Sequence, residues 1–150
     1  MIAKKIKEFI AMGKENTNKI HEFNPQVYPF RLWVGKQVPY EDVEKKFWVL
    51  DDKENRCDFD RQYYERNKFV CATCYTVSDK ESGWCGILMV IHSPKMMNIG
   101  KIAHEASHIS DYLSDVLGIE CYGFANGEPR AYFIEWCTNC IYDVFKGKVK

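Results

Sequence analysis

The stretch from Asn98 to Leu117 constrains the fold more than any other part of this chain of 150 residues. Its apolar residues recur at helical spacing, and Gly118 follows where a helix would end. On a helical wheel of about 100° per residue, four polar side chains fall within an arc of about 60°. This polar stripe comprises His104, His108, Asp111 and Asp115. The opposite arc is apolar and comprises Ile102, Ala103, Ala106, Ile109, Leu113, Val116 and Leu117.

The first half of the chain predicts short elements. We expect an amphipathic helix within residues 1–20, a strand at 28–34, a short helix at 41–50 and a surface loop at 51–60. The first helix follows from apolar residues at helical spacing over residues 2–12, namely Ile2, Ile6, Phe9 and Ile10. Pro29 has no backbone N–H to donate, so it favours an edge position for its strand.

The second half predicts a hairpin followed by two helices. Residues 69–77 and 84–92 are strand-like, and the polar connection between them indicates an antiparallel pair. Pro129 suits the first turn of a last helix over residues 129–145. The expected fold class is α+β, with one domain over residues 1–150 that holds a short antiparallel sheet and the two long helices.

The segment His104-Glu105-Ala106-Ser107-His108 matches the pattern H-E-x-x-H. On a helix its two imidazoles lie one turn apart and can bind one Zn²⁺, while the glutamate reaches a metal-bound water. The alternative is an exposed polar helix face. Because the histidines turn away from the apolar arc, the pattern favours a metal site with His104 and His108 as ligands and Glu105 as the catalytic base.

A catalytic zinc needs a third protein ligand and an open position for water. We favour Glu128, since it begins the last helix, where the partial positive charge of the helix end stabilises a carboxylate. Tyr132 and Glu135 share the stripe of Glu128 on that helix. Glu135 therefore stays open as an alternative ligand, and Glu120 is another.

This set of residues resembles the gluzincin class of metallopeptidases, in which H-E-x-x-H on one helix is completed by a glutamate on a following helix. His104, Glu105, His108 and Glu128 match that pattern, and the spacing from His108 to Glu128 is similar to that of thermolysin-like enzymes. The resemblance covers roughly residues 84–145. One departure is Tyr132, which stands where the thermolysin-like pattern has an acid.

A narrower resemblance is to short zinc peptidases encoded by tailed phages. It is carried by the motif together with two further segments, Leu32-Trp33-Val34 and Glu128-Pro129-Arg130-Ala131-Tyr132. It implies a zincin-like domain with Zn²⁺ as cofactor, a peptide or protein substrate, and a phage or host protein as partner. The implied location is the host cytoplasm or the virion.

The expected reaction is metal-assisted hydrolysis of a peptide bond, in which Glu105 takes a proton from water and passes it to the leaving amine. Tyr132 is a candidate hydrogen-bond donor to the developing oxyanion. Asp111 or Glu135 could orient a ligand histidine. By analogy with zincins, the strand at 84–92 would pair with an extended substrate.

Other functions stay open. A structural or binding protein, such as a phage particle component, could keep a zinc that only joins two helices. A zinc hydrolase for a non-peptide amide or ester would use the same residues. Two C-x-x-C pairs, Cys71 with Cys74 and Cys137 with Cys140, are a possible Cys₄ zinc site, but we expect buried free thiols there and treat Cys57, Cys85 and Cys121 as packing residues.

Composition narrows the partners. Lys+Arg and Asp+Glu both number 21, which predicts neither a nucleic-acid nor a membrane partner. Seven cysteines, an odd count, and the interrupted apolar residues at the N-terminus favour a reduced, cytoplasmic protein. The aromatic residues expected in the core are Trp33, Phe47, Trp48, Phe69, Trp84, Phe133 and Trp136.

Overall fold

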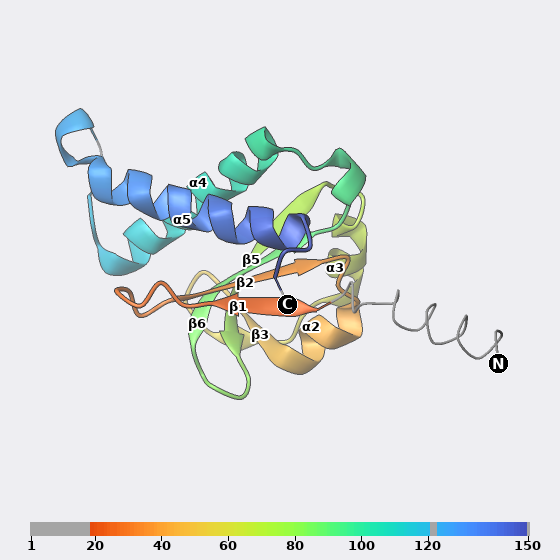
Figure 1. Ribbon diagram of the computed structural model, residues 1–150. Coiled ribbons are helices and arrows are strands. Elements are labelled where there is room, and N and C mark those ends of the chain that lie inside the picture. The colour runs from red at the N-terminus through yellow and green to blue at the C-terminus, as the bar shows by residue number, and fades with distance from the viewer. Residues whose placement is uncertain (1–18, 121–122, 150) are drawn as a thin grey trace, which may run out of the picture.

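A computed structural model describes residues 19–120 and 123–149 of the chain. The amphipathic helix expected within residues 1–20 lies almost wholly outside these residues. The chain forms a six-stranded sheet with helices on both faces (Figure 1). The class is α+β, as expected.

The sheet has the strand order β1-β2-β6-β5-β3-β4. Its strands are β1 (Ile20–Phe23), β2 (Arg31–Lys36), β3 (Phe47–Leu50), β4 (Arg56–Cys57), β5 (Ala72–Asp79) and β6 (Cys85–Ile91). The predicted antiparallel hairpin of β5 and β6 is confirmed. The prediction of an antiparallel sheet is wrong in one place, since β2 pairs parallel with β6 and the sheet is therefore mixed.

The helices cover the two faces of the sheet unequally. They are α2 (Tyr40–Lys46), α3 (Arg61–Asn67), α4 (Ile99–Leu117) and α5 (Glu128–Phe145), with short 3-10 turns η1 (Pro94–Met96) and η2 (Phe124–Asn126). The long helices α4 and α5 lie on one face and the short α2 and α3 on the other (Figure 1). Both long helices were predicted, from their periodicity together with Gly118 after the first and Pro129 at the start of the second, and both are confirmed.

Two apolar clusters result from this layering. Alternate residues of each strand point to opposite faces, so β2 sends Leu32 and Val34 toward α4 and α5 but Trp33 toward α2 and α3. Phe47 and Tyr64 complete the second cluster with Trp33. The sheet is thus buried on both faces, which explains why its central strands read as continuous apolar runs.

Several short elements differ from the expectation. The predicted strand at 28–34 begins only at Arg31 and is an interior strand, because Pro29 precedes it and leaves its N–H groups intact. The predicted helix at 41–50 ends at Lys46, and residues 47–50 form β3. Both β1 and α3 were missed, since each is too short to show a clear period.

Two aromatic residues expected in the core are exposed. Phe69 is 88% exposed and Trp84 is 41% exposed. Phe69 lies between α3 and β5, and Trp84 lies in the β5–β6 turn, where the guanidinium of Arg31 sits 4.0 Å from its ring centroid. Both positions lie outside the paired strands, so the alternation of side chains between the two faces of a sheet does not apply to them.

Candidate metal centre

Helix α4 is built so that its two histidines face away from the core. Asn98 caps its start, because its side chain accepts a hydrogen bond from the backbone N–H of Lys101 over 2.9 Å. Gly118 ends it in a left-handed conformation with φ of 61°. The buried residues of its apolar arc are Ile102, Ala106, Ile109 and Leu113. His104 and His108 are exposed, as the wheel predicts, whereas Val116 of the apolar arc is exposed as well and does not reach the core.

The two imidazoles of α4 meet at their Nε2 atoms. The distance between Nε2 of His104 and Nε2 of His108 is 3.1 Å, and the ring centroids are 4.7 Å apart. Two nitrogens that bind one tetrahedral zinc at about 2.0–2.1 Å lie about 3.3 Å from each other. The pair is thus spaced to hold one metal ion, and the same spacing suits a hydrogen bond from one ring to the other.

Glu105 lies on the side of α4 that faces β5. Its side chain is half-buried, and its Oε2 accepts a hydrogen bond from the thiol of Cys74 over 3.4 Å. Burial, followed by the nearby Glu105 carboxylate, raises the pKa of Cys74 well above its usual value. The thiol therefore stays protonated and is the donor. This contact was not foreseen from the sequence.

Strand β5 has an open edge beside this glutamate. On one side, β6 pairs with it over Ala72–Ser78. On the other side, β3 pairs only with Val77–Asp79, so residues 72–76 have no strand partner there within the described part of the chain. A short strand could be added at this edge.

The backbone of β5 directs hydrogen-bonding groups toward the open edge. The carbonyl of Cys71 accepts a hydrogen bond from the N–H of His92, on the β6 side. Because backbone groups alternate along an antiparallel strand, those of Ala72 and Cys74 point the other way. The strand expected to bind substrate, 84–92, is the interior strand β6, with partners on both sides, so that expectation is wrong.

A hollow of about 470 Å³ adjoins His104, Glu105 and the start of the open edge. Cys71 and Ala72 form one wall, and His104 and Glu105 form another. The remaining lining residues lie around the start of α4 and are Met97, Asn98, Gly100 and Lys101. His104 and Glu105 thus border a space open to a ligand.

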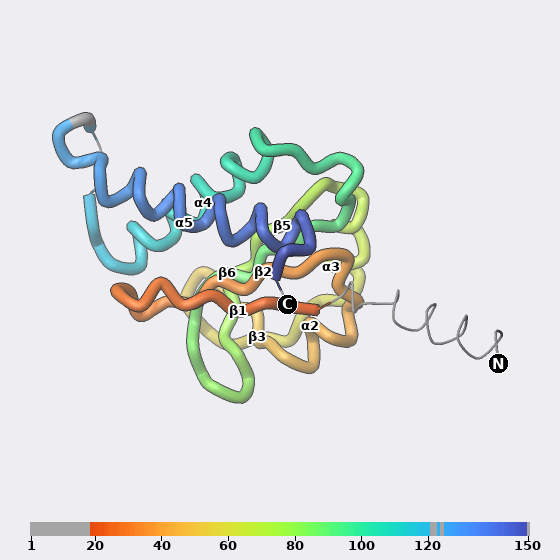
Figure 2. The backbone as a smooth tube through the Cα atoms, in the orientation of Figure 1, coloured from red at the N-terminus to blue at the C-terminus, as the bar shows by residue number. Residues whose placement is uncertain are grey.

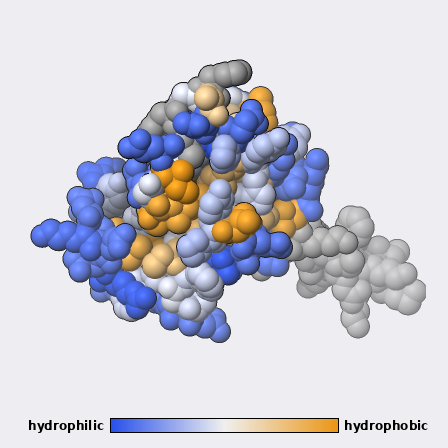
Figure 3. Space-filling view, turned by 90° about the vertical axis from the view of Figure 1, so that its left-hand side faces the viewer, coloured by the Kyte–Doolittle hydropathy of each residue, from blue (hydrophilic) through white to orange (hydrophobic). Residues whose placement is uncertain are grey.

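The structure does not bring Glu128 or Tyr132 to the histidine pair. Both are exposed, Tyr132 by 67%. They line a separate hollow of about 460 Å³ with Val27 and Trp136, next to the β1–β2 turn. Figure 2 shows this turn beneath the start of α5, and Figure 3 views the same end of the molecule, where apolar surface is visible.

The other carboxylates proposed near the site complete no metal site with the histidines within the described residues. Asp111 accepts a hydrogen bond from Arg130 over 2.6 Å, and Glu135 and Glu120 are exposed. Among residues 19–120 and 123–149, no group of three or more His, Cys, Asp or Glu side chains is placed to hold a metal ion. The described residues therefore bring together two of the three expected ligands, His104 and His108.

The cysteines are free thiols wherever the structure describes them. Cys137 and Cys140 are buried, as expected, while Cys71 and Cys74 are half-buried. Cys57 and Cys85 are exposed, so their assignment as packing residues is wrong. Cys121 lies outside the described residues. The C-x-x-C pairs form no metal site in the described part of the chain.

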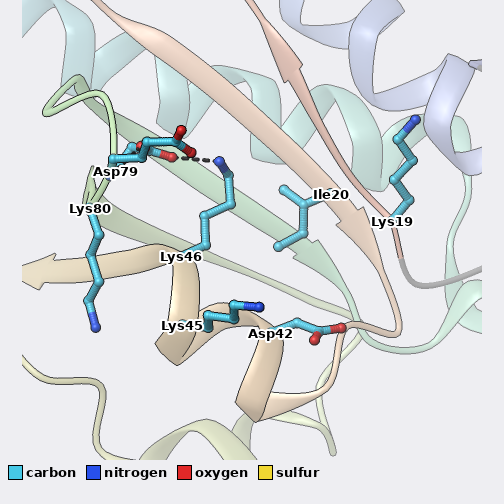
Figure 4. Close-up of a pocket in the computed structure, with 8 residues that line it drawn as sticks. Lys19, Ile20, Asp42, Lys45, Lys46, Asp79 and Lys80 are labelled. Carbon is cyan, nitrogen blue, oxygen red and sulfur yellow. Dashed lines mark hydrogen bonds and ion pairs between the residues drawn. The ribbon is translucent and has the colours of Figure 1, made fainter.

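A second hollow of about 470 Å³ has a charged lining (Figure 4). The buried charge in this lining is already paired with other groups of the protein. Its buried carboxylate, Asp79, accepts hydrogen bonds from Lys46 and from the backbone N–H groups of Glu81 and Ser82. The two backbone contacts lie within the β5–β6 turn, and the contact with Lys46 joins this turn to α2. The carboxylate is thus engaged in the fold and not directed at a ligand.

No protein-family model matches this chain, and no curated protein or solved structure matches it either. In the described residues, no helix has the length and apolar character needed to cross a membrane. The motif and its geometry are therefore the grounds for a function.

Proposed function

We propose that the chain is a zincin-like, zinc-dependent peptidase, with His104 and His108 as metal ligands and Glu105 as general base. The observation that carries the proposal is the 3.1 Å separation of the two exposed Nε2 atoms. It supports a metal site because this spacing is close to that of two ligands of one zinc ion. The half-buried Glu105 follows His104 directly and faces the same hollow.

The donor set fits a zinc ion in part. Two imidazoles are present, and each would bind zinc through Nε2 in the neutral form that carries its proton on Nδ1. Glu128 remains the proposed third ligand and Tyr132 the proposed oxyanion donor. Both roles need the first turn of α5 to lie nearer the histidines than it does in this structure. Zinc, when bound, would polarise the scissile carbonyl and lower the pKa of a water toward about 7.

The residues of the chain would supply positioning and proton transfer. Glu105 would accept a proton from the attacking water and deliver it to the leaving amine nitrogen. The open edge of β5, with the backbone groups of Ala72 and Cys74, would hold an extended peptide through main-chain hydrogen bonds. Main-chain binding accepts many sequences, which favours a peptide substrate over a compact small molecule.

A structural zinc is the competing function, and the placement of the histidines argues against it. A structural site joins elements and is closed by four protein ligands. Here both histidines lie on one helix and are exposed. An exposed pair leaves positions for water and substrate, which supports a catalytic role.

The test is cleavage of a fluorogenic peptide library by wild-type protein and by Glu105→Gln, with Glu81→Gln as the matched control. Glu81 is an exposed carboxylate in the β5–β6 turn. We expect wild type and Glu81→Gln to cleave equally and Glu105→Gln to lose cleavage while it keeps bound zinc. Equal cleavage by Glu105→Gln would rule out its role as base, and a wild type that cleaves nothing would rule out a peptidase.

A further inference from the structure

Cys74 occupies the point where β5 meets the motif helix. It pairs with Met89 of β6 across the sheet, and its neighbour Tyr75 points to the opposite face. Cys74 therefore faces α4, where its Sγ lies 3.4 Å from Oε2 of Glu105. A larger side chain at this position would push against the helix, because α4 packs directly on β5.

The direction of this hydrogen bond follows from the surroundings. Burial and the neighbouring carboxylate keep the Cys74 thiol protonated, and Cys137 of α5 adds to the effect. A protonated thiol has one S–H to donate, and the carboxylate is the acceptor in contact with it. One oxygen of Glu105 is thus held by the sheet, which leaves Oε1 as the oxygen not engaged by the thiol.

We propose that Cys74 is a positioning residue that fixes the carboxylate of Glu105 by donating its S–H to Oε2. With Oε2 held, Oε1 is the oxygen that takes the proton from water. The contact between thiol and carboxylate stands without any activity, whereas its catalytic consequence rests on the proposed function. Two separate measurements therefore test it.

The first measurement is infrared absorption of the cysteine S–H groups, which absorb where other protein groups do not. The difference between wild type and Cys74→Ser identifies the Cys74 band. We expect this band at lower frequency than that of the exposed Cys57, because the thiol of Cys74 donates to a carboxylate over 3.4 Å, whereas that of Cys57 donates to the neutral carbonyl of Asn55 over 3.7 Å. Glu105→Ala should move the band to higher frequency, and Glu105→Gln, which keeps a carbonyl acceptor, should move it less.

A Cys74 band that stays in place in Glu105→Ala would overturn the proposal. Circular dichroism of each variant checks that the comparison is between folded proteins. Should Glu105→Ala not fold, Glu105→Gln gives the same decision, because a weaker acceptor must still shift the band.

The second measurement is steady-state cleavage of the best library peptide. We expect Cys74→Ala to lower kcat by about tenfold, the lower end of what loss of an outer partner costs, with little change in KM. Cys74→Ser restores a donor and should recover most of kcat. Cys140→Ser, which replaces a buried thiol on α5, should match wild type.

An unchanged kcat in Cys74→Ala, or an equal loss in the alanine and serine variants, would overturn the positioning role. If wild-type protein cleaves no peptide, the proposed function fails and the catalytic consequence fails with it. The infrared result then still decides whether the thiol holds the carboxylate, so the two failures are distinguishable.

Discussion

Arg130, in the first turn of α5, donates a hydrogen bond from Nη2 to Oδ1 of Asp111 on α4 over 2.6 Å. Asp111 lies three residues after His108, and Arg130 two residues after Glu128. The pair therefore sets the register between the motif helix and the helix that carries the proposed third ligand. It places the start of α5 beyond the histidines along α4.

This ion pair should matter more for register than for stability. The side chains of Arg130 and Asp111 are 30% and 47% exposed, so water screens their attraction. We expect Arg130→Ala to lower the free energy of unfolding by about 0.2–1 kcal/mol in urea titrations. Adding Asp111→Ala should cost little more, since the partner is already lost. A loss of several kcal/mol would contradict the assignment as a screened pair.

His92 should make the fold sensitive to mild acid. Burial and then Lys68 lower its pKa to about 4, against a usual value of 6.5. Between these two pH values the unfolded chain binds the proton and the folded chain does not. Stability is therefore full above pH 6.5 and falls as the pH drops toward 4. The loss should reach about 3 kcal/mol at its end.

His92→Gln provides the comparison for this pH effect. Nε2 of His92 is buried and has no hydrogen-bond partner among the described residues, so its replacement breaks no hydrogen bond at this atom. Glutamine does not titrate, so the variant lacks the group that binds the proton. We measure the free energy of unfolding of wild type and variant by chemical denaturation at several pH values. We expect the difference between the two free energies to change between pH 6.5 and 4. A constant difference would contradict the buried, neutral state of His92.

Gly118 should be needed for the end of the motif helix. Its φ of 61° is strained for residues with a Cβ, although a Cβ there would meet no atom within 4 Å. Gly118→Ala should thus cost about 1–2 kcal/mol through backbone strain alone. Gly100→Ala, within the first turn of the same helix, would place a Cβ 3.3 Å from Oδ1 of Asn98, so it should cost less than Gly118→Ala, because only a side chain has to move. Equal effects in thermal unfolding would refute this reading.

Glu128 and Glu135 can be separated as candidate third ligands. Both are exposed on one stripe of α5, so each glutamine substitution should fold normally. We expect Glu128→Gln to weaken zinc binding, in competition with a chelator, by more than the roughly 10–100-fold typical of an outer partner. Glu135→Gln should leave it unchanged. The reverse pattern would make Glu135 the ligand.

The long elements could be predicted because their signals are local. The cap at Asn98, the left-handed Gly118 and the spacing of Ile102, Ala106 and Ile109 lie within one helix. The position of β2 could not be predicted in this way. Its parallel pairing with β6 joins residues such as Arg31 and Gly86, far apart in the chain, and no local pattern encodes that choice.

The same distinction holds at the site. The His104–His108 pair follows from helical spacing alone, so the sequence is sufficient to place it. The contact between Cys74 and Glu105 depends on the register of β5 under α4, which only the folded chain defines. The predicted stripe of Glu128 is present but faces solvent, because the apolar side of α5 takes the core position.

The most direct test of the metal site is the zinc content of protein purified without chelators, measured by mass spectrometry of the metal. We predict about one zinc ion per chain in wild type and a stoichiometric loss in both His104→Ala and His108→Ala. Asp115→Ala, which removes an exposed acid from the same stripe of α4, should keep the metal. A metal-free wild type, or histidine variants that bind zinc as wild type does, would contradict the proposed centre.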